Sequence, residues 1–186
     1  MAVKAIREYD GKGMLHRHLT SFSDGNVVFN HRMCQVKVPK PTEVGGEHGQ
    51  IDWGALRAAH PWVDSVPLVV KPDQLIKRRG KAGLLKLNAS WEDVQSWVNE
   101  RAGREIEVDG VRGVLDTFLV EEFVPHSDED EYYLCIQSNR EGEEVLFHHE
   151  VRQTAKCGRV DAQLFCPLAA MFRFIFACSN LWFCIM

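Results

Sequence analysis

The chain has 186 residues, of which 45% are hydrophobic and 26% are charged, and its formal net charge is −4. A chain of this length and composition is expected to bury a core in one domain, or in one domain and part of another. The acidic balance argues against nucleic acid as a general partner, because binding to a phosphate backbone needs a basic face.

The N-terminal part of the chain changes from helical to strand-like spacing. Apolar residues recur at helical intervals over residues 4–19, which predicts a helix. Strand-like residues follow at 27–38, and a segment rich in proline, glycine and charge at 37–50 predicts a surface loop. Residues 52–60 predict a short helix, which Pro61 ends because the residue before a proline avoids the helical conformation.

Two buried strands and a capped helix are expected in the middle of the chain. The strands cover residues 68–70 and 84–87. Ser90 is expected to cap a helix that runs to about Arg101, with Asp93 completing a box-like cap. The helix carries an apolar stripe, which we expect to lie in the core: Trp91, Val94, Trp97 and Val98.

The following part of the chain is rich in hairpins. Strands are expected at 105–108 and 111–124, joined by an Asp-Gly turn. A second hairpin is expected from 132–137 and 145–149. Helices alternating with strands, followed by hairpins, predict an α/β fold with an α+β extension.

The segment VVKPDQLIKRRGKAGLLKL combines features of a phosphate-binding cradle. A β-branched run delivers Lys71 at its end, and a basic glycine loop that contains Arg79 and Gly80 follows. Lysine and arginine neutralise phosphate charge, and loop glycines let backbone N–H groups approach the oxygens. The chain contains no G-x-x-x-x-G-K-[ST] loop. For KRRGK taken by itself, a solvated basic turn or a nuclear-localisation-like patch remains an alternative.

Several longer segments resemble one family. VVKPDQLIKRRGKAG, LVEEFVPHS, EYYLCI and REGEEVLFHHE are similar to the start of ATP-citrate lyase (ATP-citrate synthase), which carries an ATP-grasp module of the succinyl-CoA synthetase β-subunit type. The resemblance runs from the N-terminus to about Glu150. It implies an incomplete ATP-grasp fold, with a partial nucleotide-binding domain over residues 1–150 and a non-family apolar tail over residues 151–186.

The resemblance also implies a binding residue at each part of a nucleotide. Lys71, Arg79 and Gly80 match the family's phosphate-contacting positions. Glu122 and Val124 lie on the hinge strand whose backbone reads adenine, and Glu122 stands where the family is expected to have proline. Glu131 matches the acidic residue that binds the ribose hydroxyls. The alternative is that these acids form a solvated surface.

The implied cofactor is ATP, with Mg²⁺ held in the family by ligands that this chain does not contain. The parent enzyme uses ATP, citrate and CoA to make acetyl-CoA and oxaloacetate, with citrate and CoA bound by other modules, so we assign no catalytic residue here. The alternative is a catalytically inactive isoform that binds nucleotide weakly or docks to full-length subunits. His148 and His149 are expected to point to opposite strand faces and so not to share a metal.

The tail has a composition of its own. Four of the six cysteines lie in it, and residues 164–186 are mostly apolar. Read-through of an intron, an unrecognised native segment and a membrane anchor all fit, although Arg173 makes membrane insertion unfavourable. Any tail fold is expected to be irregular or an isolated helix. The N-terminus MAVKAIREYD has no apolar signal-peptide core, so the expected location is the cytoplasm.

Overall fold

The computed structural model describes the backbone of residues 6–25, 30–40, 49–74, 76, 79–80, 82–108, 110–126, 132–138, 143–148 and 181–185. The chain divides into two compact units, Arg32–Phe123 and a second that combines Met1–His31 with Val124–Met186. We describe each unit by itself.

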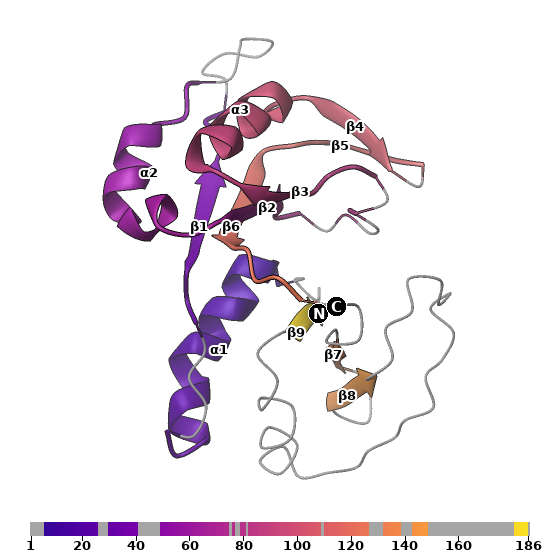
Figure 1. Cartoon of the computed structure of the whole chain (residues 1–186). Coiled ribbons are helices and arrows are strands. Elements are labelled where there is room, and N and C mark those ends of the chain that lie inside the picture. Colours follow the sequence, from indigo (N-terminus) through magenta and orange to yellow (C-terminus); the bar gives the residue numbers. More distant parts are fainter. Residues whose placement is uncertain are drawn as a thin grey trace. The chain divides into compact units, whose positions relative to one another are not determined.

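The unit Arg32–Phe123 is built on an antiparallel four-stranded sheet (Figure 1). The strand order is β1-β6-β2-β3, so that β6 lies between β1 and β2, which both come much earlier in the chain. The bounds of the strands are β1 Met33–Lys37, β2 Leu68–Pro72, β3 Lys86–Ala89 and β6 Thr117–Glu122.

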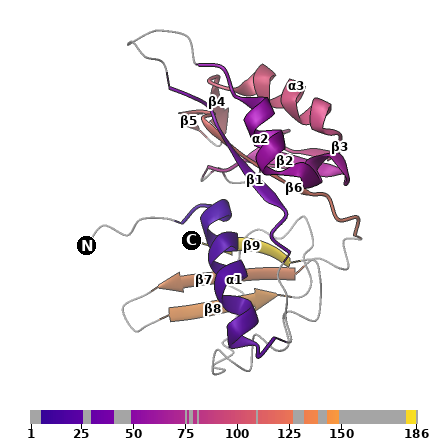
Figure 2. The ribbon, with the colours of Figure 1, turned by 90° about the vertical axis from the view of Figure 1, so that its left-hand side faces the viewer.

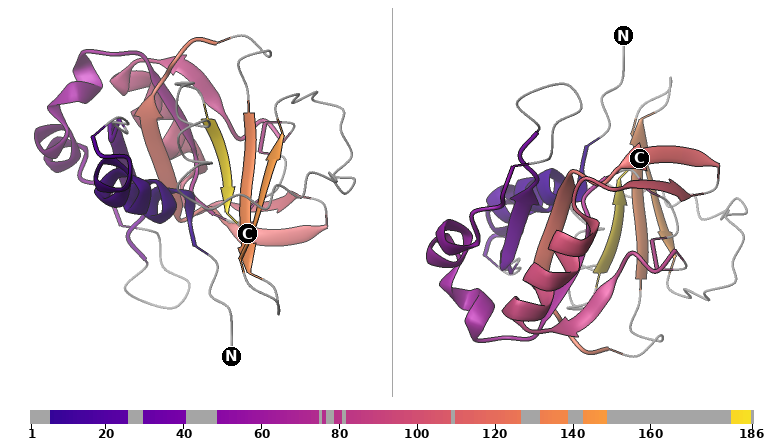
Figure 3. Two further views of the ribbon diagram at one scale, coloured as in Figure 1. Left: turned by 90° about the horizontal axis from the view of Figure 1, so that it is seen from below. Right: turned by 90° about the horizontal axis from the view of Figure 1, so that it is seen from above.

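Helices cover one face of this sheet (Figure 3). α3 (Trp91–Arg101) packs on β2 and β3, while α2 (Trp53–Ala59) continues into the short 3-10 helix η1 (Pro61–Asp64). The apolar stripe of α3 is confirmed as core, because all four of its predicted residues are buried. Trp91 also meets Trp53 of α2 edge to face, at 5.6 Å between ring centroids. Aromatic contacts of this geometry join the two helices over a common core.

The start of α3 agrees with the predicted cap. The Ser90 side chain accepts a hydrogen bond from the Asp93 N–H, and the Asp93 carboxylate accepts one from the Ser90 N–H. These bonds satisfy backbone donors that a helix start otherwise leaves unpaired. They also lower the pKa of Asp93, with the Ser90 backbone bond as the largest cause.

Two strand predictions are wrong. The buried strand expected at 84–87 is β3, which begins at Lys86 and has three exposed residues out of four. The expected strand over residues 111–124 is two strands, β5 (Val111–Val114) and β6, which belong to different sheets. β5 pairs with β4 (Glu105–Val108) in a hairpin that extends away from the main sheet (Figure 1). The chain changes sheets at Leu115 and Asp116, where Leu115 binds the backbone of Arg104 and is itself buried in the core.

The second unit contains α1 (Glu8–Phe22) and a three-stranded sheet of order β8-β7-β9 (Figure 2). β7 (Tyr132–Ser138) and β8 (Glu143–His148) form the predicted antiparallel hairpin. β9 (Leu181–Ile185) pairs in parallel with β7 and contacts α1. The expectation of an irregular or isolated helical tail is therefore wrong for these five residues, whose apolar, aromatic side chains favour a strand.

Candidate nucleotide site

One face of the main sheet packs against the helices, and Lys71 lies on the opposite face, which carries both apolar and charged residues. Side chains alternate between faces along a strand. Leu68 and Val70 of β2 belong to the hydrophobic core under α3. Lys71 therefore points to the opposite face, together with Glu121 of β6, which pairs in register with Val69.

Lys71 is a buried cation with a buried partner. Its Nζ lies 2.8 Å from Glu121 Oε2, and the two side chains are only 6% and 13% exposed. The sheet register explains the contact, because Lys71 pairs with Leu119 and Glu121 is the next residue along β6 on the same face. Charged groups this poorly exposed need a partner to stay ionised. The sequence did not predict that the Glu121 side chain pairs with Lys71, because only backbone contacts were expected of this strand.

A second polar pair lies on the same face. Asp73, directly after β2, is 1% exposed and accepts a hydrogen bond of 2.9 Å from Gln35 Nε2 of β1. Gln35 pairs in register with Leu119, which itself pairs with Lys71. The alternation of Val69, Lys71 and Asp73 was the available sequence signal for this face. Three strands thus contribute polar side chains to this face, next to the fully buried Leu119.

The basic glycine loop is tied to the end of β2. Arg79 Nη1 donates a hydrogen bond of 2.7 Å to the carbonyl of Pro72, the residue after Lys71. The Arg79 carbonyl accepts from the Leu84 N–H, and Gly83 follows with φ +66°. A positive φ suits glycine, so Gly83 lets the loop turn back toward β3. The structure therefore brings the guanidinium of Arg79 to the strand end that carries Lys71.

Gly80 is exposed in this loop, and a Cβ there would lie 3.4 Å from Leu85 Cδ1. Its backbone is close to the turn, since its carbonyl accepts from the Gly83 N–H at 3.2 Å. The position leaves the loop backbone open to approach from outside, which is the property expected of a phosphate-contacting glycine.

The two residues predicted from the sequence to contact adenine, Glu122 and Val124, belong to different units. Glu122 ends β6, and its carboxylate lies 3.2 Å from Arg32 Nη1. Val124 is exposed and belongs to the second unit, where its carbonyl lies 2.8 Å from His126 Nδ1. Glu131 and His149 lie outside the described residues.

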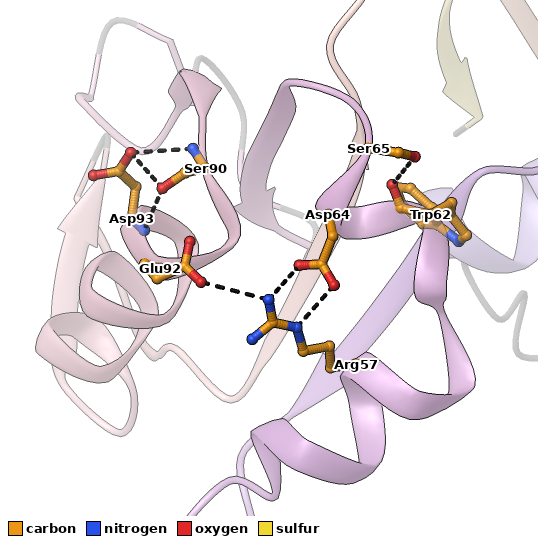
Figure 4. Close-up of polar contacts among 7 residues, drawn as sticks. All are labelled: Arg57, Trp62, Asp64, Ser65, Ser90, Glu92 and Asp93. Atoms are coloured by element: carbon orange, nitrogen blue, oxygen red, sulfur yellow. Dashed lines mark hydrogen bonds and ion pairs between the residues drawn. The ribbon is translucent and has the colours of Figure 1, made fainter.

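A separate open groove of about 530 Å³ lies at the start of α3. Its wall includes Arg57, which bridges Asp64 at 2.8 Å and Glu92 at 3.7 Å (Figure 4). The hydrogen bond to Asp64 is the largest cause of a raised pKa at Arg57. None of the described site residues predicted from the sequence lines this groove. The Arg57 contacts link α2, η1 and α3, so we read them as structural.

Within the described part of the chain, no group of three or more histidine, cysteine, aspartate or glutamate side chains is placed to hold a metal ion. The same residues include no helix that is long and apolar enough to cross a membrane.

The unit Arg32–Phe123 is thus a mixed helix and sheet fold with a buried lysine and the Arg79 loop at the end of β2. The family model for the ATP-citrate synthase ATP-grasp domain matches residues 2–162, so the match continues past Glu150. The chain therefore belongs to the family of ATP-citrate synthase ATP-grasp domains.

Individual relatives agree with the family model. The chain is 44% identical over 150 residues to ATP-citrate synthase of Bos taurus. The matched region covers 81% of this chain and 13% of the relative. It is 42% identical to the probable ATP-citrate synthase subunit 2 of Schizosaccharomyces pombe, covering 81% of this chain and 34% of that subunit.

A solved structure resembles the chain as well. ATP citrate lyase from Methanothrix soehngenii, in complex with citrate and coenzyme A, matches with a TM-score of 0.64 and 36% identity. The match covers 80% of this chain and 32% of that one. The chain thus spans about a third or less of the length of these relatives.

Proposed function

We propose that the chain binds ATP at the C-terminal end of β2, as the ATP-grasp part of an ATP-citrate lyase. Lys71 and Arg79 contact the phosphates, and Gly80 lets the loop backbone approach them. The backbone of Glu122 and Val124 reads the adenine edge, and Glu131 accepts hydrogen bonds from the ribose hydroxyls.

The position of Lys71 carries this proposal. Its ammonium lies on the face of the sheet opposite the hydrophobic core, near the end of β2. The Arg79 guanidinium binds the carbonyl of Pro72, the residue that follows Lys71 in β2. Two cations at one strand end, beside a loop that contains glycine, suit a ligand with several negative oxygens. Their separation along the chain by a turn is the pattern expected of a cradle rather than of a solvated basic patch.

The chain's own contribution is to bind and orient the nucleotide. Positioning and charge neutralisation account for most of the catalysis of phosphoryl transfer. Mg²⁺, when bound in the family's enzymes, neutralises charge on the phosphates. Citrate and CoA, the ligands of the solved relative, would be bound by segments that relatives have outside the matched region. The working enzyme would make acetyl-CoA and oxaloacetate in the cytoplasm, alongside full-length subunits.

Isothermal titration of the full chain with ATP tests the proposal. Lys71→Met and Arg79→Ala should each weaken binding tenfold or more, because a hydrogen bond to a charged group contributes about 1.5–3 kcal/mol. Arg112→Ala is the matched control, since Arg112 pairs with Glu107 on the β4–β5 hairpin. Absence of ATP binding by the unmodified chain, or equal affinity in all variants, contradicts the proposal. Turnover of citrate and CoA, with and without full-length subunits, separates activity from nucleotide binding.

A further inference from the structure

The Lys71–Glu121 pair places an anion where a phosphate would have to bind. The Nζ–Oε2 distance of 2.8 Å is a full hydrogen-bonded ion pair, and both side chains are largely withdrawn from water. A lysine ammonium has three N–H donors, so it can bind a carboxylate and a phosphate together. Its charge, however, is already balanced before the phosphate arrives.

We propose that Glu121 is the resident counterion of Lys71 and that it sets the affinity of this site for phosphate by competing with the ligand for that lysine. The proposal rests on the proposed function, because it takes Lys71 to be the phosphate-binding lysine. It assigns Glu121 a role of its side chain, in addition to the backbone contacts expected of its strand.

The physical argument compares the states before and after binding. In the unliganded protein, Glu121 lies 2.8 Å from the poorly exposed Lys71 ammonium and compensates its charge. In the bound protein, the phosphate compensates the same ammonium and is repelled by the nearby carboxylate. Removing the Glu121 charge therefore destabilises the unliganded state more than the bound state. Anything that stabilises the bound state relative to the unliganded one raises affinity.

The same argument applies to ligands that share the phosphate group, and only to them. Adenosine has no charge to place near Lys71, so the Glu121 charge should not affect its binding. Inorganic tripolyphosphate has the charge without the base, so it should respond as ATP does. A role of Glu121 in holding the strand together would change the binding of all three ligands alike.

The test compares the full chain with Glu121→Gln, Lys71→Met and the double variant, by isothermal titration at one fixed ionic strength. Glu121→Gln should bind ATP and tripolyphosphate about tenfold more tightly, and adenosine equally well, because one opposing charge at short range is removed. In the Lys71→Met background the same change should bring a smaller gain, because the competition for the lysine is gone and only the repulsion between carboxylate and phosphate remains. Glu121→Asp, which keeps the charge on a shorter side chain, should bind like the unmodified chain or slightly more tightly, and it remains available if Glu121→Gln fails to fold.

Glu107→Gln is the matched control, because Glu107 makes an ion pair of the same 2.8 Å length with Arg112 but on an exposed hairpin. It should leave all three affinities unchanged. If Lys71→Met weakens ATP binding while Glu121→Gln leaves it unchanged or weakens it, the inference about Glu121 is overturned and the proposed function stands. If Lys71→Met has no effect on ATP or tripolyphosphate, both are overturned. For Glu121→Asp, a loss of tripolyphosphate affinity would equally overturn the inference, since it would mean that the carboxylate supports phosphate binding.

Discussion

The free energy of the Lys71–Glu121 pair can be measured without any ligand. Breaking a buried ion pair by removing one partner costs about 3–5 kcal/mol, because the remaining charge is left uncompensated. Glu121 keeps some exposure, which places the expected cost of Lys71→Met or Glu121→Gln near the lower end, about 3 kcal/mol. For a chain of 150–250 residues, 1 kcal/mol changes the melting temperature by about 2–4 °C, so each variant should melt about 6–12 °C lower.

The double variant is the decisive measurement. If each charge stabilises the fold mainly by compensating the other, Lys71→Met combined with Glu121→Gln should lower the free energy of unfolding no more than either single change. The coupling energy between the two sites would then be about 3 kcal/mol. Urea unfolding followed by tryptophan fluorescence suits the assay, because Trp91 and Trp97 are buried in the same unit as the pair. Strictly additive losses, or single losses below about 1 kcal/mol, would refute the view that this is a buried and mutually dependent pair.

Two further predictions concern the same unit. Ser90→Ala should destabilise α3 by about 0.5–2 kcal/mol. Because the Asp93 pKa is lowered in the folded state, the stability contributed by this carboxylate is complete above the ordinary value of 3.8 and is lost as the pH falls through the folded value. The free energy of unfolding in urea should therefore fall more in acid for the unmodified chain than for Asp93→Asn. Burial raises the Cys34 pKa from 9.0 to about 11, so Cys34 should be alkylated far more slowly at pH 8 in the folded than in the unfolded chain, and rapid alkylation of the folded chain would contradict burial of the thiol. The stability linked to this thiol is complete below pH 9 and is lost toward pH 11. Cys34→Ala should remove that loss of stability at alkaline pH.

The elements that the sequence predicted best are those with a local cause. The cap of α3 depends on Ser90 and Asp93, three residues apart, and the helix stripe depends on spacing within one helix. The split between β5 and β6 has no local cause. It arises because one half pairs with β4 and the other with β1 and β2, so the chain changes partners at Leu115 although its strand-like composition continues.

The candidate site divides in the same way. Lys71 could be predicted from the sequence because it ends an apolar run just before a basic loop. The Glu121 side chain could not, because its contact with Lys71 depends on the register between β2 and β6, two strands that are far apart in the chain. The Gln35–Asp73 hydrogen bond could not be predicted from the sequence either, because it depends on a third strand, β1. A sequence motif identifies a group that can bind, whereas the groups that compete with the ligand come from the sheet pairing.

The residue at the hinge illustrates how such pairing can absorb a change in sequence. Glu122 stands where the family resemblance predicts proline, which would bring neither an N–H nor a charge. Here the Glu122 N–H donates to the carbonyl of Arg32 at 3.3 Å, and the Glu122 carboxylate meets the Arg32 guanidinium at 3.2 Å. Both added groups are therefore taken up by the residue that precedes β1. The ion pair is exposed enough to contribute little stability. Its consequence is that a glutamate occupies this strand end without an uncompensated charge beside the backbone proposed to read adenine.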